Sequence, residues 1–310
     1  MTRHLAAPLD LTVMMYHYVR DPSDAAEAGS GIPGLPLERF AAQLDELARQ
    51  HTLVSWPAVR DALAETRPLP PNACLLTFDD GLCDHFLNVF PLLRARGLSG
   101  LFFMLARRPG EDLPLPFKLH YLKAALGFER LREMVWQRLD VNQREICNTA
   151  NTRYPARWGA DGIFKTVLQR DLSQAAEPML SRLFAEQIGG EAEIAARSFV
   201  SQGKAREMLA GGMHCGGHSL SHPWFDWIGA EALRAEIAAS AAWLSAVEPG
   251  PWAFAYPYGG LNPAAPAMLA AHNFAAAFTT VEQTRHTDAY LIGRLDGEDM
   301  VMVPSAKTHA

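Results

Sequence analysis

Asp79 and Asp80 are adjacent carboxylates at the end of a short apolar run, residues 73–78, and Gly81 follows them. The run is β-prone and typical of a strand that is buried on both faces of a sheet. Side chains alternate along a strand, so two neighbours serve one site only where the strand ends and the chain turns. Two crowded carboxylates repel each other, and a bound cation relieves this by taking one as a ligand and leaving the other as a base. An isolated Asp-Asp-Gly could equally cap the next helix.

His218 and His222 lie four residues apart in a segment with glycines before the pair and Pro223 after it. On one turn this spacing puts both imidazoles on one face, where they can bind one cation. The glycines and the proline favour a loop or a single turn at a strand end over a long helix. An aspartate with two histidines leaves coordination positions open for water and substrate, which is typical of a catalytic metal site. Zinc is expected for this donor set, and cobalt, nickel and iron also suit it.

Two other predicted strand ends carry candidate residues. Residues 252–256 form an apolar run that ends in Pro257-Tyr258 and two glycines. This could be a stiff turn only, but glycine-flanked backbone N–H groups at a strand end also make an oxyanion site. Residues 11–15 form another run, and His17 follows it within Tyr-His-Tyr. That histidine could be a site residue, or it could simply be hydrogen-bonded by backbone.

The elements that must position these residues alternate between strands and helices. This order predicts parallel pairing, in an α/β barrel or a doubly wound sheet. Residues 107–200 interrupt the alternation with helical patterns and almost no strand signal, so we expect a helical insertion within one domain spanning 1–310. The predicted strands outside the insertion are 11–15, 52–55, 73–78, 100–105, 213–215, 252–256 and 275–280, and the predicted helices are 37–50, 56–65, 85–96, 205–209, 230–247 and 264–272. Within the insertion, helical patterns cover 117–126, 129–139, 162–169 and 178–188.

The composition and the N-terminal segment indicate which partners and which cellular compartment to expect. The chain has 310 residues, 34 of them acidic and 28 basic, for a net charge of −6. No run of Lys or Arg suggests nucleic-acid binding. Neither the first ten residues nor the apolar run after them is long and apolar enough for a signal sequence or a membrane span, so we expect a cytoplasmic protein. The sequence carries no signal for an oligomeric state.

The four cysteines have no paired spacing and are expected to be reduced thiols. A thiol ligand from Cys83 or Cys215 stays open, because both lie near the expected site in the sequence.

Three motifs together resemble a known family. TFDDG at 77–81, HSLSH at 218–222 and AYPYG at 255–259 are similar to motifs of the polysaccharide deacetylases, the NodB-like group also called carbohydrate esterase family four, and occur in the family's order. The similarity spans roughly residues 11–303. It implies a distorted barrel of the (β/α)7 type, with one divalent metal at the carboxyl ends of the strands.

The resemblance also implies roles. Asp79 matches the general base, Asp80, His218 and His222 match the metal ligands, and Tyr258, after Pro257, lies where the family uses a backbone N–H to hold an oxyanion.

Two departures from the family's pattern matter. Many members carry an arginine in the third motif, where this chain has Phe-Ala-Tyr at 254–256, and Arg294 is our candidate for the missing charge. Many members also place a general-acid histidine in a Leu-x-His motif near the C-terminus, which is absent here. His17 resembles the arrangement of a branch with the acid histidine on the first strand, which makes it the first choice, with His286 as the second.

These residues predict a metal-dependent hydrolase that removes an N-acyl group, most simply N-acetyl, from an amino sugar or a small glycan intermediate. Because no export signal is evident, the expected substrate is intracellular, such as a nucleotide- or lipid-linked sugar. The alternatives are an amidase acting on a non-sugar C–N bond and a non-catalytic glycan-binding or scaffold protein. The carboxylate left over for a base speaks against the last, since a binding module needs none.

Overall fold

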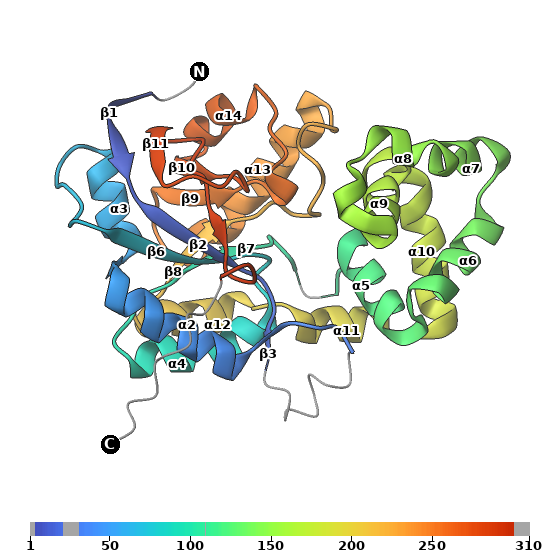
Figure 1. Ribbon diagram of the computed structural model, residues 1–310, viewed down its shortest axis with the longest axis horizontal. Coiled ribbons are helices and arrows are strands. Elements are labelled where there is room, and N and C mark those ends of the chain that lie inside the picture. The colour runs from blue at the N-terminus through green and yellow to red at the C-terminus, as the bar shows by residue number, and fades with distance from the viewer. Residues whose placement is uncertain (1–3, 21–30, 109, 301–310) are drawn as a thin grey trace.

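The computed structural model describes residues 4–20, 31–108 and 110–300 (Figure 1). The remaining parts of the predicted 1–310 domain lie outside the described residues. The central element is a parallel sheet in the order β10-β9-β8-β7-β6-β2-β12, with β5 paired to the first half of β6. Its strands are β2 (Thr12–Tyr16), β5 (Thr52–Val54), β6 (Ala73–Phe78), β7 (Leu101–Met104), β8 (His214–Gly217), β9 (Trp252–Ala255), β10 (Phe274–Phe278) and β12 (Leu295–Asp296).

The sheet curls until its two edges are joined by one short segment of chain. Ile292 forms a parallel bridge with Phe278 of β10, and Leu295 pairs with Met14 of β2. Residues 292–296 therefore connect the first and last strands of the parallel series. This confirms the predicted α/β class and the distorted (β/α) barrel.

Side chains alternate along β6 between the outer and inner sides of the curled sheet. Leu76 and Phe78 belong to the cluster that packs against the surrounding helices, whereas Ala73 and Leu75 belong to the cluster inside the barrel. By the same alternation Thr77 and then Asp79 face inward. The register of β6 thus directs the first of the two carboxylates toward the barrel interior.

Helices cover the outside of the sheet, and their apolar faces explain why they dock there. Phe40, Leu44 and Leu47 recur at helical spacing on α2 and are buried against the outer face. In Figure 1, α2, α4 and α12 lie along one side of the sheet, and α13 and α14 lie along another. The helices around the barrel are α2 (Leu37–Gln50), α3 (Trp56–Leu63), α4 (Phe90–Ala95), α12 (Gln202–Ala210), α13 (Ala230–Ser245) and α14 (Ala265–Ala271).

Most predicted elements are present within a few residues of their expected bounds, and the exceptions are local. The helix predicted at 85–96 begins as a π-helix, η1 (His85–Val89), before continuing as α4. The sequence did not predict the antiparallel ribbon of β1 (His4–Asp10) and β11 (Arg285–Asp288), nor the short pair β3 (Val19–Arg20) and β4 (Leu35–Pro36). The β1 strand is largely exposed, so it lacks the apolar alternation on which strand prediction depends.

The chain between β7 and β8 forms a group of helices beside the barrel, coloured green to yellow in Figure 1. This group has its own buried cluster, built around Leu122, Leu180 and Phe184. Lys118 is buried within it and reaches Ser181 at 2.8 Å and Glu191 at 3.2 Å, which ties three of the helices together. The helices are α5 (Leu115–Leu126), α6 (Phe128–Arg138), α7 (Val141–Asn148), α8 (Ala150–Arg153), η2 (Ala156–Trp158), α9 (Gly159–Thr166), η3 (Val167–Asp171), α10 (Ser173–Gln187) and α11 (Glu191–Ser198).

None of the described helices combines the length and the apolar character that a membrane span requires.

Candidate active site

The candidate residues meet at the carboxyl end of the curled sheet. His17 follows β2, Asp79 and Asp80 follow β6, and the segment from His218 to His222 follows β8. The carboxyl ends of parallel strands share one edge of the sheet, so residues far apart in the sequence come together there. A cavity of about 560 Å³ is lined by all five of these side chains.

Asp80, His218 and His222 form a buried trio whose ligand atoms all lie within 4.8 Å of one another. The Oδ1 atom of Asp80 is 3.3 Å from Nε2 of His218 and 3.3 Å from Nε2 of His222. Within the described residues, Asp80 Oδ1 and His218 Nε2 have no hydrogen-bond partner, although both are buried. Two buried polar atoms without partners are costly unless something binds them.

The second nitrogen of His218 determines what that partner must be. Its Nδ1 lies 2.8 Å from the carbonyl oxygen of Ala255, to which it donates. In the neutral ring, Nε2 then carries a lone pair that faces the Asp80 carboxylate, so both atoms are acceptors. A histidine fixed by a backbone carbonyl on one nitrogen is the usual arrangement of a metal ligand. The donor set of one carboxylate and two imidazoles therefore fits a divalent transition metal, with zinc first among them.

The charges around the trio favour an ionised Asp80. Burial alone would raise the pKa of this carboxyl, but His218 and His222, when protonated, would donate to it and hold it well below its ordinary value. Burial likewise lowers the pKa of the His222 imidazole, and the nearby Asp80 offsets this only in part. An ionised carboxylate beside a neutral imidazole is the state in which both can ligate a cation.

The backbone at the site is held in an unusual conformation. Seven non-glycine residues of the described chain have positive φ, and four of them are here: Asp80 at 75°, Ser219 at 72°, His222 at 58° and Tyr258 at 57°. For L-residues this region is unfavourable by about 1–2 kcal/mol each. Such conformations persist where the surrounding structure enforces them, and they concentrate at functional sites. Here they turn the ends of three strands toward one point.

Asp79 is paired with Arg294 across the barrel interior. The guanidinium donates to both carboxylate oxygens, at 2.6 Å to Oδ1 and 2.7 Å to Oδ2, and its Nε donates to the Thr279 carbonyl at 3.0 Å. Both side chains are almost fully buried. Burial alone would raise the pKa of Asp79, but Arg294 and His218 reverse this, and the pKa lies below its ordinary value. Arg294 thus orients the carboxylate and keeps it ionised.

His17 is the histidine that the structure brings to this carboxylate. Its Nε2 lies 3.9 Å from Asp79 Oδ2, and its side chain is 39% exposed, so it borders the cavity. His85, from the π-helix η1, donates through Nε2 to the His17 carbonyl at 2.8 Å. Burial lowers the pKa of His85 to about 4, so this ring is neutral at physiological pH. His85 was not among the predicted site residues, and it fixes the backbone of His17.

His286, the second choice for a general acid, is not brought to the site. Its Nε2 is bonded to the carbonyl of Leu11, just before the first residue of β2, at 2.9 Å. His17 follows the other end of that strand. His286 therefore lies at the amino end of the barrel, and its second nitrogen accepts from the Gly293 N–H at 3.3 Å.

Pro257 and Tyr258 form the turn after β9, beside the trio. The Tyr258 ring lies edge-on to His222 with centroids 4.5 Å apart, and it stacks on Trp224 at 4.3 Å. Pro257 is buried beneath the turn. Within the described chain, the backbone N–H of Tyr258 makes no hydrogen bond. A free N–H in a turn next to the cavity is what an oxyanion contact requires.

The two cysteines left open as ligands do not take part. Cys215 is buried within β8 and belongs to the outer core. Cys83 accepts a contact from Lys204 Nζ at 3.0 Å. The described chain offers one metal-ligand cluster, the aspartate and two histidines described above.

The helical group supplies a wall of the cavity, and its lining residues were not among the predicted site residues. Phe117, His120 and Lys123 recur at spacings of three along α5 and line the cavity, as do Lys165 and Gln169. This spacing places the three α5 residues on one helix face, and it is the signal that could have identified them. Burial lowers the pKa of His120 to about 4, and its Nδ1 lies 3.3 Å from the Tyr18 hydroxyl.

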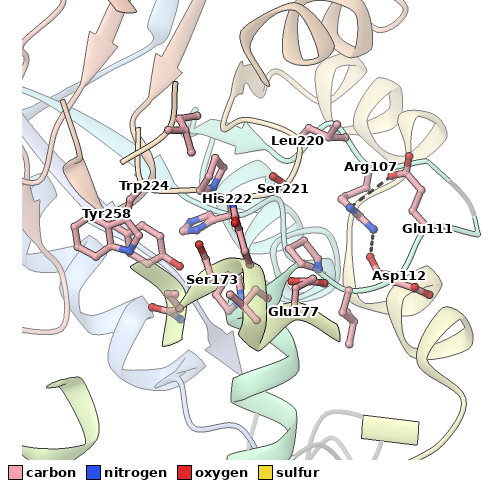
Figure 2. A pocket seen from close by; sticks show the side chains of 18 of the residues that line it. Arg107, Glu111, Asp112, Ser173, Glu177, Leu220, Ser221, His222, Trp224 and Tyr258 are labelled. Atoms are coloured by element: carbon pink, nitrogen blue, oxygen red, sulfur yellow. Dashed lines mark hydrogen bonds and ion pairs between the residues drawn. The ribbon is translucent and has the colours of Figure 1, made fainter. Parts of the chain in front are cut away.

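A second cavity, of about 650 Å³, lies on the other side of His222 and Tyr258 (Figure 2). It shares these two residues with the first cavity, along with Pro116 and Gln169. Figure 2 shows Arg107 bonded to Glu111 and Asp112 at its far end. The site therefore continues past the histidines into a largely apolar pocket that also holds the charged side chains of Arg107, Glu111, Asp112 and Glu177.

Comparisons with known proteins find similarity to one family. The polysaccharide deacetylase family profile matches residues 182–277, which include both histidines of the trio and the Tyr258 turn. Over this segment the chain is similar to the polysaccharide deacetylase family. A relative of this chain is YxkH of Bacillus subtilis (strain 168), whose name places it among the polysaccharide deacetylases; it is 23% identical over 140 residues, which are 45% of this chain and 43% of YxkH. The match thus spans less than half of that relative.

Solved structures share the fold of this protein over nearly the whole chain. The Streptococcus pyogenes deacetylase PplD in complex with acetate has a TM-score of 0.58 and 15% identity, covering 93% of this chain and 92% of PplD. IcaB from Ammonifex degensii has a TM-score of 0.55 and 21% identity, covering 98% of this chain and 95% of IcaB. At these identities the likeness concerns the fold.

Proposed function

We propose that this protein is a metal-dependent hydrolase that removes an N-acyl group, most simply N-acetyl, from an amino sugar or a small glycan intermediate. The observation that carries the proposal is the pair of buried acceptor atoms, Asp80 Oδ1 and His218 Nε2, that face each other 3.3 Å apart without a hydrogen-bond partner. Similarity to the polysaccharide deacetylase family supports a deacetylase, and the trio supports the metal. The cytoplasmic location and the single-domain organisation expected from the sequence stay predictions.

The chain's residues take distinct parts in this reaction. Asp80, His218 and His222 would hold the ion. When bound, a divalent ion supplies Lewis acidity, which polarises the acyl carbonyl and lowers the pKa of water. Asp79 would take the proton of the attacking water, since it is ionised and held in place by Arg294.

Two further groups would act on the carbonyl oxygen and on the departing amine. The free Tyr258 N–H would donate to the carbonyl oxygen as negative charge develops there. His17, in its protonated form, would give a proton to the departing amine, because an amine leaves poorly unless it is protonated. Its position at 3.9 Å from Asp79 Oδ2 puts acid and base at the same cavity wall. This arrangement resembles the branch with the acid histidine on the first strand.

The experiment that tests the proposal measures the product of the purified protein, with its metal restored, on several amides. We expect acetate from N-acetylated amino sugars and none from the Asp79→Asn variant. Release of ammonia or another amine from a non-sugar amide, without acetate from any sugar, would replace the proposal with the non-sugar amidase. Binding of N-acetylated sugars without turnover of any amide would replace it with a glycan-binding protein.

A further inference from the structure

Lys123 and Lys165 line the same cavity as the proposed catalytic residues, and neither has a role in the reaction above. Lys123 lies on α5 and Lys165 lies on α9, so the two ammonium groups approach the cavity from different helices. Their side chains are 35% and 32% exposed, which leaves both partly open to a ligand.

The two lysines share one carboxylate. Asp161 Oδ2 lies 2.5 Å from Lys123 Nζ and 4.0 Å from Lys165 Nζ. In the part of the chain that the structure describes, no other acidic side chain is paired with either nitrogen, although Glu298 also lines the cavity. The group of three therefore carries a net positive charge. A single lysine would have been enough to neutralise Asp161.

Electrostatic effects show that this charge acts within the site. Burial lowers the pKa of Lys165, Asp161 raises it and the neighbouring Lys123 lowers it again, which leaves it below its ordinary value. The charge of Lys165 also lowers the pKa of His120, and the charge of Asp80 acts on the same ring in the opposite direction. His120 thus lies within electrostatic range of both the lysine pair and the metal trio. An anion between the two lysines would relieve their repulsion.

We propose, on the basis of the proposed function, that the acylated substrate carries an anionic substituent, a phosphate or a carboxylate, and that Lys123 and Lys165 bind it while the acyl group lies at Asp80, His218 and His222. A lysine ammonium is a compact point charge that suits phosphate and carboxylate oxygens. A cavity of about 560 Å³ is within the size range of sites for small ligands, so it accommodates a charged monosaccharide. The lysine pair then selects the substrate class, and the trio of Asp80, His218 and His222 determines which amide bond is hydrolysed.

The test compares three N-acetylated sugars that differ in charge. These are methyl N-acetylglucosaminide, N-acetylglucosamine 1-phosphate and N-acetylmuramic acid, and the last two separate phosphate from carboxylate as the source of the anion. We expect kcat/KM for acetate release to be at least about tenfold higher for one of the charged sugars, mostly through KM. In the double variant Lys123→Gln with Lys165→Gln this preference should fall below about twofold, while kcat/KM for the neutral sugar stays within about twofold of the wild-type value.

Two controls keep the result specific. Lys204→Gln removes the same charge from α12, outside the cavity, and should keep the full preference. If the double variant does not fold, Lys165→Gln alone replaces it. This single variant leaves the shorter contact between Lys123 and Asp161 intact and should lose most of the preference. Equal loss in the Lys204 variant, or no preference in the wild-type protein, would overturn the inference.

Calorimetric binding of the expected products separates this inference from the proposed function, because it does not require turnover. One of the two charged products, glucosamine 1-phosphate or muramic acid, should bind at least about tenfold more tightly than methyl glucosaminide, and the double variant should remove the difference. If no sugar releases acetate but this difference in binding is found, the deacetylase proposal fails and the anion site stands. If the neutral sugar releases acetate and neither charged product binds more tightly, the anion site fails and the deacetylase stands.

Discussion

Replacing Arg294 with methionine should destabilise the protein strongly, because it leaves the Asp79 carboxylate buried without its counter-charge. The guanidinium makes two short hydrogen bonds to Asp79, at 2.6 and 2.7 Å, and both side chains are almost fully buried. Removing one partner of a buried ion pair lowers the free energy of unfolding by roughly 3–5 kcal/mol. Methionine replaces the aliphatic stem of the arginine but leaves the space of the guanidinium empty, so a cavity adds to the loss of charge and hydrogen bonding.

The destabilisation should depend on pH in a defined direction. In the wild-type protein the pKa of Asp79 is lowered, so its contribution to stability is present above the unfolded-state pKa, about 3.9, and is lost as the pH falls through the folded-state value. Without Arg294, burial is no longer outweighed by the guanidinium, and the pKa of Asp79 should rise above its unfolded value. The variant then becomes less stable as the pH rises. The difference between the two proteins should be largest near neutral pH and smaller at about pH 4.

Urea unfolding at both pH values measures this difference. Both proteins are treated with a chelator first, so that metal release does not contribute to the change with pH. A double-mutant cycle with Asp79→Asn isolates the interaction of the pair, and a coupling of at least about 2 kcal/mol is expected for two charged hydrogen bonds. A difference below about 1 kcal/mol that is the same at both pH values would refute the reasoning. It would mean that Arg294 does not stabilise an ionised Asp79.

Three other variants test the remaining roles. Asp79→Asn should lower kcat at least about 100-fold and leave the metal content unchanged, because it removes the base and keeps the ligands; a rate near that of the wild-type protein would make the base assignment wrong. His17→Gln should also lower kcat about 100-fold, with KM within about threefold, because it removes the proton donor to the amine; undiminished kcat would exclude His17 as the acid. His85→Phe keeps a ring in the core but removes the donor to the His17 carbonyl, so kcat should fall about tenfold while unfolding in urea changes little. If instead the stability falls and kcat measured on folded protein is unchanged, His85 only supports the core.

The sequence was most informative where local signals coincide with strand ends. The apolar runs before Asp79 and His17 predict strands, and parallel strands bring their carboxyl ends to one edge, so their proximity follows from the order of elements alone. The spacing of four residues between His218 and His222 predicts by itself that both imidazoles lie on one face of a turn. Arg294 was a hypothesis from a missing charge, and the structure places its guanidinium against Asp79. That contact joins residues 215 positions apart, which no local pattern specifies.

What the sequence did not predict depends on tertiary packing. The helical patterns between residues 107 and 200 were recognised, but the face of α5 that reaches the cavity is set by how its helices pack around their own core. Lys123 and Lys165 lie in these helical patterns, and no local signal in the sequence marks them as site residues. The π-helix that holds His85 was read as a regular helix, since one extra residue in a turn leaves little trace in apolar spacing. The left-handed backbone conformation of Asp80 and Tyr258 could not be predicted either, because neither residue is a glycine.

The most direct test of the account is the metal content of the purified protein, measured together with acetate release before and after chelation. The account predicts one divalent ion per chain, loss of acetate release on chelation and its return when the metal is restored. The His218→Ala variant should bind less metal by a factor of at least about ten, since one of three protein ligands is gone. A wild-type protein that binds no divalent ion at any loading, or that releases acetate equally well in the presence of chelator, would contradict the central claim.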